Sequence, residues 1–321
     1  MKKRHGLLFG SAALLITALF TMASCGRPVE SPSRRVELPD PANPDIKAKF
    51  GVSTASQAFT KLHRLISGPK GAYDFTKVIA LGDYIDLPAL AVAGYPIDEA
   101  DTGSGSPGYA MGKINVTNDE LSGHGRLLRL IVVGINSFNG INGNNTPHVV
   151  FQFQNVPVTH RMNASNTSVG GYKESQMRSY LIYNFFAGLT DAGVPANLLW
   201  TPKRIVWNGF LSGENGASSA NTVVDTIKDK IFLPTDWEMF GGNEASSPTY
   251  ETVANQGRLD YYKNADHRIK YNSSNAAAAY WLASPHFTQK GYFCNVRDNG
   301  DAATINASSP TRFVAPAFCI K

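Results

Sequence analysis

The fold of this chain is decided near its C-terminal end by four segments: YWLASP at 280–285, GYFCNV at 291–296, DNGD at 298–301 and FVAPAF at 313–318. The Asp-Asn-Gly run fits a hairpin turn, because Asn and Gly tolerate the positive φ that such turns require. This part of the chain is rich in Asn, Ser, Ala and aromatic residues, lacks helical periodicity and ends in a strand-like run at 312–320. We therefore expect strands and turns here rather than helices.

Two helices are predicted upstream of these segments. In the segment 175–192 the residues Met177, Leu181, Phe185 and Leu189 recur every four positions, and Gly193 with Pro195 ends the pattern. The segment 54–66 has apolar residues at helical spacing, with Thr54 or Ser56 as the N-cap. A short additional helix is expected to begin at 195–199.

Apolar runs predict several strands along the rest of the chain. They lie at 77–85 (as a strand pair or a strand and turn), 126–135, 149–156, 204–207 and 230–233. Thr235 and Glu238 form a capping box that opens a helical turn. No internal repeat is present, so the chain is predicted to be an α+β domain with short strands, two main helices and long loops.

The composition limits the class of protein. Hydrophobic residues make up 43% and charged residues 17% of the chain, which suits a folded core and argues against disorder. The formal net charge is +5, but Lys2, Lys3 and Arg4 lie in a segment expected to be removed, which leaves a surplus of only two. A nearly neutral chain without a basic stripe is not expected to bind nucleic acid.

The N-terminus predicts export and lipid anchoring. Three basic residues precede a mostly apolar run at 7–20, which is too short to span a bilayer and is typical of a signal peptide. MASC at 22–25 resembles a lipobox, which makes Cys25 the lipidated N-terminus after cleavage; an ordinary secretory signal with an incidental cysteine is the alternative. We expect a signal peptide at 1–24, a Pro-rich tether at 25–46 and a helical segment at 47–76 packed on the domain.

No residue pattern predicts an enzyme, a metal site or a cofactor. The seven histidines lack metal-ligand spacing, and no G-x-S-x-G elbow or P-loop occurs. GSGSPG at 103–108 fits G-x-G-x-x-G but neither follows a strand nor opens a helix, so it is predicted to be a flexible loop.

The C-terminal motifs resemble those of C-type-lectin-like domains of the formylglycine-generating-enzyme type. The resemblance rests on WLASP at 281–285, the hairpin after it, VAPAF at 314–318, LGDYI at 81–85 and LPTDWE at 233–238, and it spans residues 77–321. It implies a C-type-lectin-like fold with short twisted antiparallel strands, in which the last motifs form a small sheet. Sequence triplets for calcium-dependent sugar binding are missing.

Ala283 and Ala315 stand where this family prefers arginine, and such departures resemble the variable proteins of diversity-generating retroelements, the treponemal variable lipoproteins among them. In those systems randomised Asn-type codons supply a restricted set of residues, and residues 272–315 are rich in that set. The same rule implies that Trp281, Gln289 and Lys290 are fixed.

A mixture of aromatic and adaptable polar side chains is also what binding surfaces favour. The alternative is that the aromatic residues are core and the Asp-Asn-Gly run is only a turn. We expect Trp281, Phe293 and Phe318 in the core. The expected ligand-binding residues, with His286, Tyr292 and Arg297 exposed, are Tyr280, Ala283, His286, Phe287, Tyr292, Asn295, Arg297, Asp298, Asn299, Asp301, Thr304 and Ala315.

Cys294 and Cys319 are the only cysteines after Cys25. In an exported protein an even pair favours a disulfide. Two further interpretations stay open: Cys294 is a diversified position beside a buried Cys319 thiol, or the two form a catalytic pair like that of the formylglycine-generating enzymes.

The resemblance and the N-terminus together predict a monomeric lipoprotein displayed on the bacterial outer membrane. Its partner is expected to be a protein or a cell-surface ligand, bound by the diversified region. The alternatives are a lectin-like envelope lipoprotein with a fixed ligand, a structural lipoprotein without one, and an oxidase of the formylglycine-generating type.

Overall fold

The computed structural model describes residues 44–68, 74–94, 112–117, 128–156, 158–210, 224–242, 257–272 and 274–321. The predicted signal peptide, Cys25, nearly all of the tether and the glycine-rich loop at 103–108 lie outside these residues. The described part is a mixture of helices and antiparallel strands, so the predicted α+β class is confirmed.

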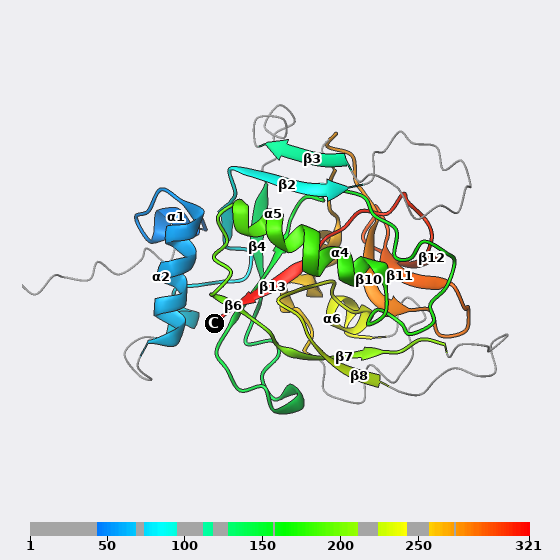
Figure 1. Cartoon of the computed structure of the whole chain (residues 1–321). Coiled ribbons are helices and arrows are strands. Elements are labelled where there is room, and N and C mark those ends of the chain that lie inside the picture. The colour runs from blue at the N-terminus through cyan, green and yellow to red at the C-terminus, as the bar shows by residue number, and fades with distance from the viewer. Residues whose placement is uncertain are drawn as a thin grey trace, which may run out of the picture. The chain divides into compact units, whose positions relative to one another are not determined.

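The main sheet is antiparallel and joins strands that are far apart in the sequence. Its order is β1 (Tyr84–Asp86), β4 (Arg129–Ile135), β5 (Val149–Phe153), β13 (Ala317–Ile320) and β6 (Leu199–Trp200), and β9 (Ile231–Phe232) also pairs with β13. β5 pairs with all of β13, and β9 and β6 pair with its first and second halves. β13 is therefore the central strand of the main sheet (Figure 1).

A second sheet contains three of the four C-terminal segments that the sequence singled out. Its order is β10 (Tyr280–Pro285), β11 (Tyr292–Val296) and β12 (Ala302–Asn306). The fourth segment, at 313–318, leads into β13 of the main sheet, so the expectation that the terminal motif joins the small sheet is wrong. Two-stranded ribbons are formed by β2 (Ala89–Gly94) with β3 (Gly112–Thr117), and by β7 (Lys203–Trp207) with β8 (Val224–Lys228). The strands predicted at 126–135, 149–156 and 230–233 are confirmed with shorter bounds, and the one at 204–207 is confirmed and is one residue longer. The segment 77–85 holds a turn and then β1.

The helix predicted at 54–66 is α2 (Ala55–Ser67), and it follows the short α1 (Ile46–Lys49). Thr54 is its N-cap and forms a capping box with Gln57. The buried Phe59 ring lies 5.4 Å from the ring of Phe151 in β5 and 6.1 Å from that of Phe318 in β13. Helix α2 therefore packs on the middle of the main sheet.

The helix predicted at 175–192 is confirmed and consists of α4 (Gln176–Tyr180), the π-helical turn η3 (Leu181–Phe185) and α5 (Phe186–Asp191). Ser175 caps it, because its Oγ accepts from the Arg178 amide at 3.1 Å. Met177, Leu181, Phe185 and Leu189 are all fully buried, as their spacing predicted. The helix expected to begin at 195–199 is wrong: these residues form a turn that leads into β6.

The remaining helical segments are short. They are η1 (Phe75–Lys77), η2 (Ile141–Gly143), α6 (Asp236–Phe240), η5 (Asp260–Lys263) and η6 (Ala265–Arg268). The capping box of Thr235 and Glu238 is confirmed at the start of α6. Among the described residues, no helix combines the length and the apolar character needed to cross a membrane.

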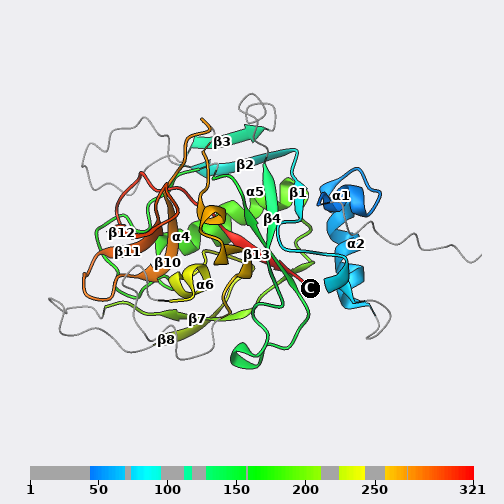
Figure 2. The same cartoon turned by 180° about the vertical axis from the view of Figure 1, so that it is seen from behind.

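The three-stranded sheet separates two apolar clusters. Trp281 and Phe293 face the larger cluster, which includes residues of α2 and α4, while Tyr280 and Cys294 face the smaller one, which includes Tyr262 of η5. Alternating side chains of a strand point to opposite faces, so β10 and β11 are buried on both faces, whereas the edge strand β12 is half-buried. In both views the sheet lies on the opposite side of β13 from α2 (Figures 1 and 2).

Candidate functional site

The candidate site is the segment 271–314, which is attached to the main sheet at both of its ends. At its start, Tyr271 bridges Asn155, and the Val156 amide donates to the Tyr271 carbonyl at 3.0 Å. At its end, Phe313 bridges Thr159, and the Val314 amide donates to the Val158 carbonyl at 2.9 Å. Both ends therefore meet the few residues that follow β5. We call the segment 271–314 the C-terminal module.

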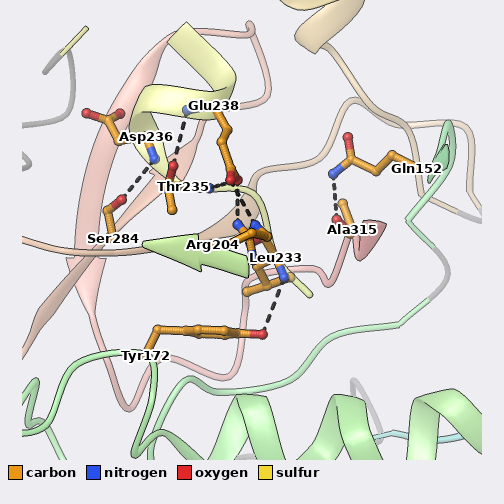
Figure 3. Close-up of polar contacts among 9 residues, drawn as sticks. All are labelled: Gln152, Tyr172, Arg204, Leu233, Thr235, Asp236, Glu238, Ser284 and Ala315. Atoms are coloured by element: carbon orange, nitrogen blue, oxygen red, sulfur yellow. Dashed lines mark hydrogen bonds and ion pairs between the residues drawn. The ribbon is translucent and has the colours of Figure 1, made fainter. Parts of the chain in front are cut away.

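A buried chain of side chains reinforces this attachment. Lys270 Nζ donates to the Phe153 carbonyl at 2.5 Å and to the Tyr262 hydroxyl at 3.3 Å, and that hydroxyl donates to Gln152 Oε1. Gln152 Nε2 then donates to the Ala315 carbonyl at 2.6 Å (Figure 3). Burial lowers the pKa of Lys270 to about 7, because its amine is fully enclosed. Residues on both sides of the module are thus tied to β5.

A buried polar cluster joins β10 of the small sheet to α6 and β7. It contains residues of the motifs at 233–238 and 281–285 together with Arg204. Arg204 Nε donates to Glu238 Oε1 at 2.8 Å, and Glu238 also completes the cap of Thr235 (Figure 3). The Asp236 amide donates to Ser284 Oγ at 2.9 Å. The Ala283 amide donates to the Pro234 carbonyl at 2.8 Å.

Arg204 and Glu238 are each about 1% exposed, so their charges face each other away from water. Removing one partner of such a pair costs about 3–5 kcal/mol. The cluster therefore holds β10 against α6, and we assign it a structural role. The two motifs that were recognised in the sequence are in contact here.

The predicted ligand-binding residues do not form one patch, because they divide between the two ends of the sheet. The charged end is the β11–β12 turn, with Arg297, Asp298, Asn299 and Asp301 all exposed. The Arg297 amide donates to the Asp301 carbonyl at 2.8 Å, and Asn299 Nδ2 donates to Asp301 Oδ2 at 2.7 Å. Gly300, at φ +85°, supplies the left-handed residue of the turn.

The aromatic end is the β10–β11 connection, with Phe287 exposed and Tyr292 half-buried. The ring of Phe287 lies 6.2 Å from that of the buried Trp207. The expectation that His286 is exposed is wrong, because only 9% of it is accessible. Its Nδ1 accepts from the amides of Thr288 and Gln289 at 3.0 and 3.1 Å, so the ring holds the turn together. Burial lowers the pKa of His286, which favours this neutral, accepting form.

Four further predicted ligand-binding residues are fully buried, namely Tyr280, Ala283, Asn295 and Ala315. They are not surface contacts in this structure, because both faces of β10 and β11 are covered. Tyr280 donates its hydroxyl to the Arg268 carbonyl at 2.8 Å. Thr304, opposite Cys294 in the edge strand β12, is half-buried.

The residues expected in the core are confirmed there: Trp281, Phe293 and Phe318 are fully buried. Trp281 Nε1 donates to the His160 carbonyl at 2.6 Å, and the His160 ring stacks on Tyr180 of α4 with 4.2 Å between ring centres. Burial lowers the pKa of His160 to about 4, so this ring is neutral at neutral pH. These contacts tie the sheet to the main helix.

The interpretation of Cys294 and Cys319 as a disulfide is wrong, because both are buried thiols. Cys294 is in β11 of the small sheet, whereas Cys319 is in β13 of the main sheet. Burial raises the pKa of the Cys319 thiol, which keeps it protonated and unreactive. Within the described residues, no group of three or more His, Cys, Asp or Glu side chains is placed to hold a metal ion.

Arg312 is a candidate site residue that was not predicted from the sequence. Arg312 is half-buried, its Nη1 donates to Thr311 Oγ1 at 3.2 Å, and it lies near Arg297 and Asp298. Burial lowers the pKa of its guanidinium. The sequence feature that could have indicated Arg312 is its position directly before the aromatic Phe313. Neighbouring side chains in an extended strand point to opposite faces, so an inward Phe313 implies that Arg312 lies on the other face.

Comparison with known proteins yields a family. A family model described as "Domain of unknown function (DUF6273)" matches residues 145–321, which is more than half of the chain. No curated protein and no solved structure matches the chain. The matched residues include β5, β13 and the whole C-terminal module, and the chain therefore belongs to the DUF6273 family.

Proposed function

We propose that this protein is a lipid-anchored binding protein whose C-terminal module carries a diversified ligand-binding surface. The observation that carries this proposal is the attachment of both ends of the module to the residues after β5. A segment closed at its base can change at its exposed ends without altering the strands to which it is attached. We further propose that the fold is C-type-lectin-like, with the domain at 77–321 and the helical segment 47–76 packed on it.

The arrangement of exposed residues supports a binding role. Rigid aromatic area at Phe287 and Tyr292 and polar groups at Arg297–Asp301 lie at opposite ends of five-residue strands. Five residues of strand span about 17 Å. A partner that touches both ends must therefore be large, which favours a protein or a cell surface over a small molecule.

The proposal includes export and display. A signal peptide at 1–24, lipidation at Cys25 and a tether at 25–46 would place a monomer on the outer membrane, bound to no nucleic acid and without catalytic activity. Growth with radiolabelled palmitate tests the anchor: label is expected in the parent protein and absent in Cys25→Ser. Label retained in Cys25→Ser would contradict the assignment.

The diversification is tested by sequencing this locus from many cells of one lineage. We expect substitutions at codons 272–315 to concentrate at exposed positions such as Arg297, Asp298 and Asn299. Trp281, Gln289 and Lys290 are expected to stay fixed. A window as constant as the codons of α4 and α5 would reject diversification and leave a lectin-like lipoprotein with a fixed ligand.

A further inference from the structure

Two arginines at the charged end of the small sheet lack carboxylate partners. Within the described residues, neither Arg297 nor Arg312 forms an ion pair. The Nε of Arg312 is buried and has no hydrogen-bond partner there. The half-buried arginines Arg129 and Arg178 each make two hydrogen bonds to an aspartate, whereas Arg258 and Arg268 resemble Arg312 in having a buried Nε without a partner among the described residues. Among the described residues, the only charge of opposite sign that acts on Arg312 is the nearby Asp298, and it does not form an ion pair with it.

A buried amide precedes Arg297 by two residues in the chain. Asn295 of β11 is fully buried, and neither its Nδ2 nor its Oδ1 has a hydrogen-bond partner among the described residues. Leaving a buried polar group unpaired costs about 1–3 kcal/mol, so such a group calls for an explanation. A ligand that supplies the missing hydrogen bond is one explanation that the neighbouring arginines favour.

The strand register places these three side chains on one face of the sheet. Asn295 lies opposite Trp281 and faces the larger cluster, and Arg297 follows it by two residues. Phe313 pairs in parallel with Tyr280 and packs with the smaller cluster, so the preceding Arg312 points to the face of Asn295.

The space between the two arginines is occupied by a small residue. The Phe313 amide donates to the Ala279 carbonyl, which sets Arg312 beside Ala279 at the edge of β10. Arg297 comes directly after Val296, the partner of Tyr280, and so reaches the other side of Ala279. Ala279 is partly exposed and contributes only a methyl group.

We propose that Arg297, Arg312 and Asn295 form an oxyanion-binding subsite that takes the carboxylate of an acidic segment of a protein partner. Guanidinium groups bind carboxylates through paired, charge-assisted hydrogen bonds, and the Asn295 amide adds a donor at the inner end of the site. Asp298 lies close enough to Arg312 to act on it electrostatically. This nearby negative charge favours a singly charged carboxylate over a doubly charged phosphate. The subsite rests on the proposed binding function for the nature of its partner.

The test uses the full-length chain in detergent and fluorescein-labelled octaglutamate at low ionic strength, with fluorescence anisotropy as the readout. Arg297→Ala and Arg312→Ala are each expected to weaken binding about tenfold, the loss typical of a hydrogen bond to a charged group. Arg312→Gln replaces the alanine variant if that variant does not fold. The matched control is Arg64→Ala, an exposed arginine on α2, which should leave binding unchanged.

Asn295→Leu separates a binding role from a structural one. The substitution is expected to weaken octaglutamate binding and to maintain or raise the unfolding temperature, because the amide has no internal partner to lose. Unchanged binding in the arginine variants, or an equal loss in Arg64→Ala, would overturn the proposal. Competition by sulfate at lower concentration than by acetate would overturn the choice of a carboxylate.

Failure of the subsite and failure of the proposed function give different combinations of results. Codons 272–315 that vary among cells, combined with no octaglutamate binding, would reject the subsite alone. Constant codons combined with binding that depends on Arg297 and Arg312 would reject diversification and retain the subsite.

Discussion

The two ends of the small sheet are built in different ways. At the aromatic end the turn depends on the inner residues, because the His286 ring accepts two amides and Phe287 lies near the buried Trp207. At the charged end the side chains of Asn299 and Asp301 form hydrogen bonds, among the described residues, only with each other and with their own turn. Substitutions should therefore lower the free energy of unfolding more at the aromatic end than at the charged end. A binding surface can vary most where its side chains support nothing else.

The largest expected effect lies behind both ends, at the buried ion pair. Glu238→Ala leaves Arg204 charged without its partner and should lower the free energy of unfolding by about 3–5 kcal/mol in urea denaturation. The double variant Arg204→Met with Glu238→Leu should recover most of this loss. If Glu238→Ala is nearly as stable as the parent protein, the two ends of the sheet do not depend on the Arg204–Glu238 ion pair.

Lys270, at the base of the module, should make stability depend on pH. Its folded pKa of about 7 lies below the unfolded value of 10.5, so between these values the unfolded chain binds more protons. Stability should therefore rise with pH through this window, by up to about 1.4 kcal/mol per unit. Lys270→Met should remove the rise and stabilise the protein by about 1–4 kcal/mol at pH 6. Parallel stability–pH curves for the two proteins would contradict this role.

His286→Ala measures what the aromatic end contributes to stability. The substitution leaves the Thr288 and Gln289 amides without their acceptor and should cost about 1–3 kcal/mol. Hydrogen exchange should show faster opening at 286–291 and no change at 297–301. Equal acceleration at both ends would mean that the sheet opens as one unit.

The smallest effect is expected at the charged end. Asn299→Ala removes hydrogen bonds that are exposed to water, and it should change stability by about 0.5 kcal/mol or less. A thermal unfolding midpoint within experimental scatter of the parent would agree. A cost comparable to that of His286→Ala would remove the difference between the two ends.

Local signals in the sequence predicted the helices and most strands. The helix starts at Thr54 and Ser175 follow local rules, because an N-cap side chain bonds to a backbone amide only three positions away. The capping box of Thr235 and Glu238 was predictable for the same reason.

Burial from both sides could not be predicted in this way. A strand pattern does not reveal whether one or two layers cover it, so Tyr280, Ala283 and Asn295 were assigned to a surface. The sequence spacing of Cys294 and Cys319 likewise does not reveal that their strands belong to different sheets. Arg312 was missed because its relation to Arg297 depends on the pairing of distant segments.

The position of β13 has a consequence for the order of folding. β5, β6 and β9 are all synthesised before the strand that joins them, so the main sheet stays incomplete until residues 317–320 are available. Contacts between such distant segments slow folding, because a long loop must close before they form. Residues 272–315 are therefore translated before the central strand. A variant of this segment that aggregates before β13 is made does not fold, so it cannot be selected for binding.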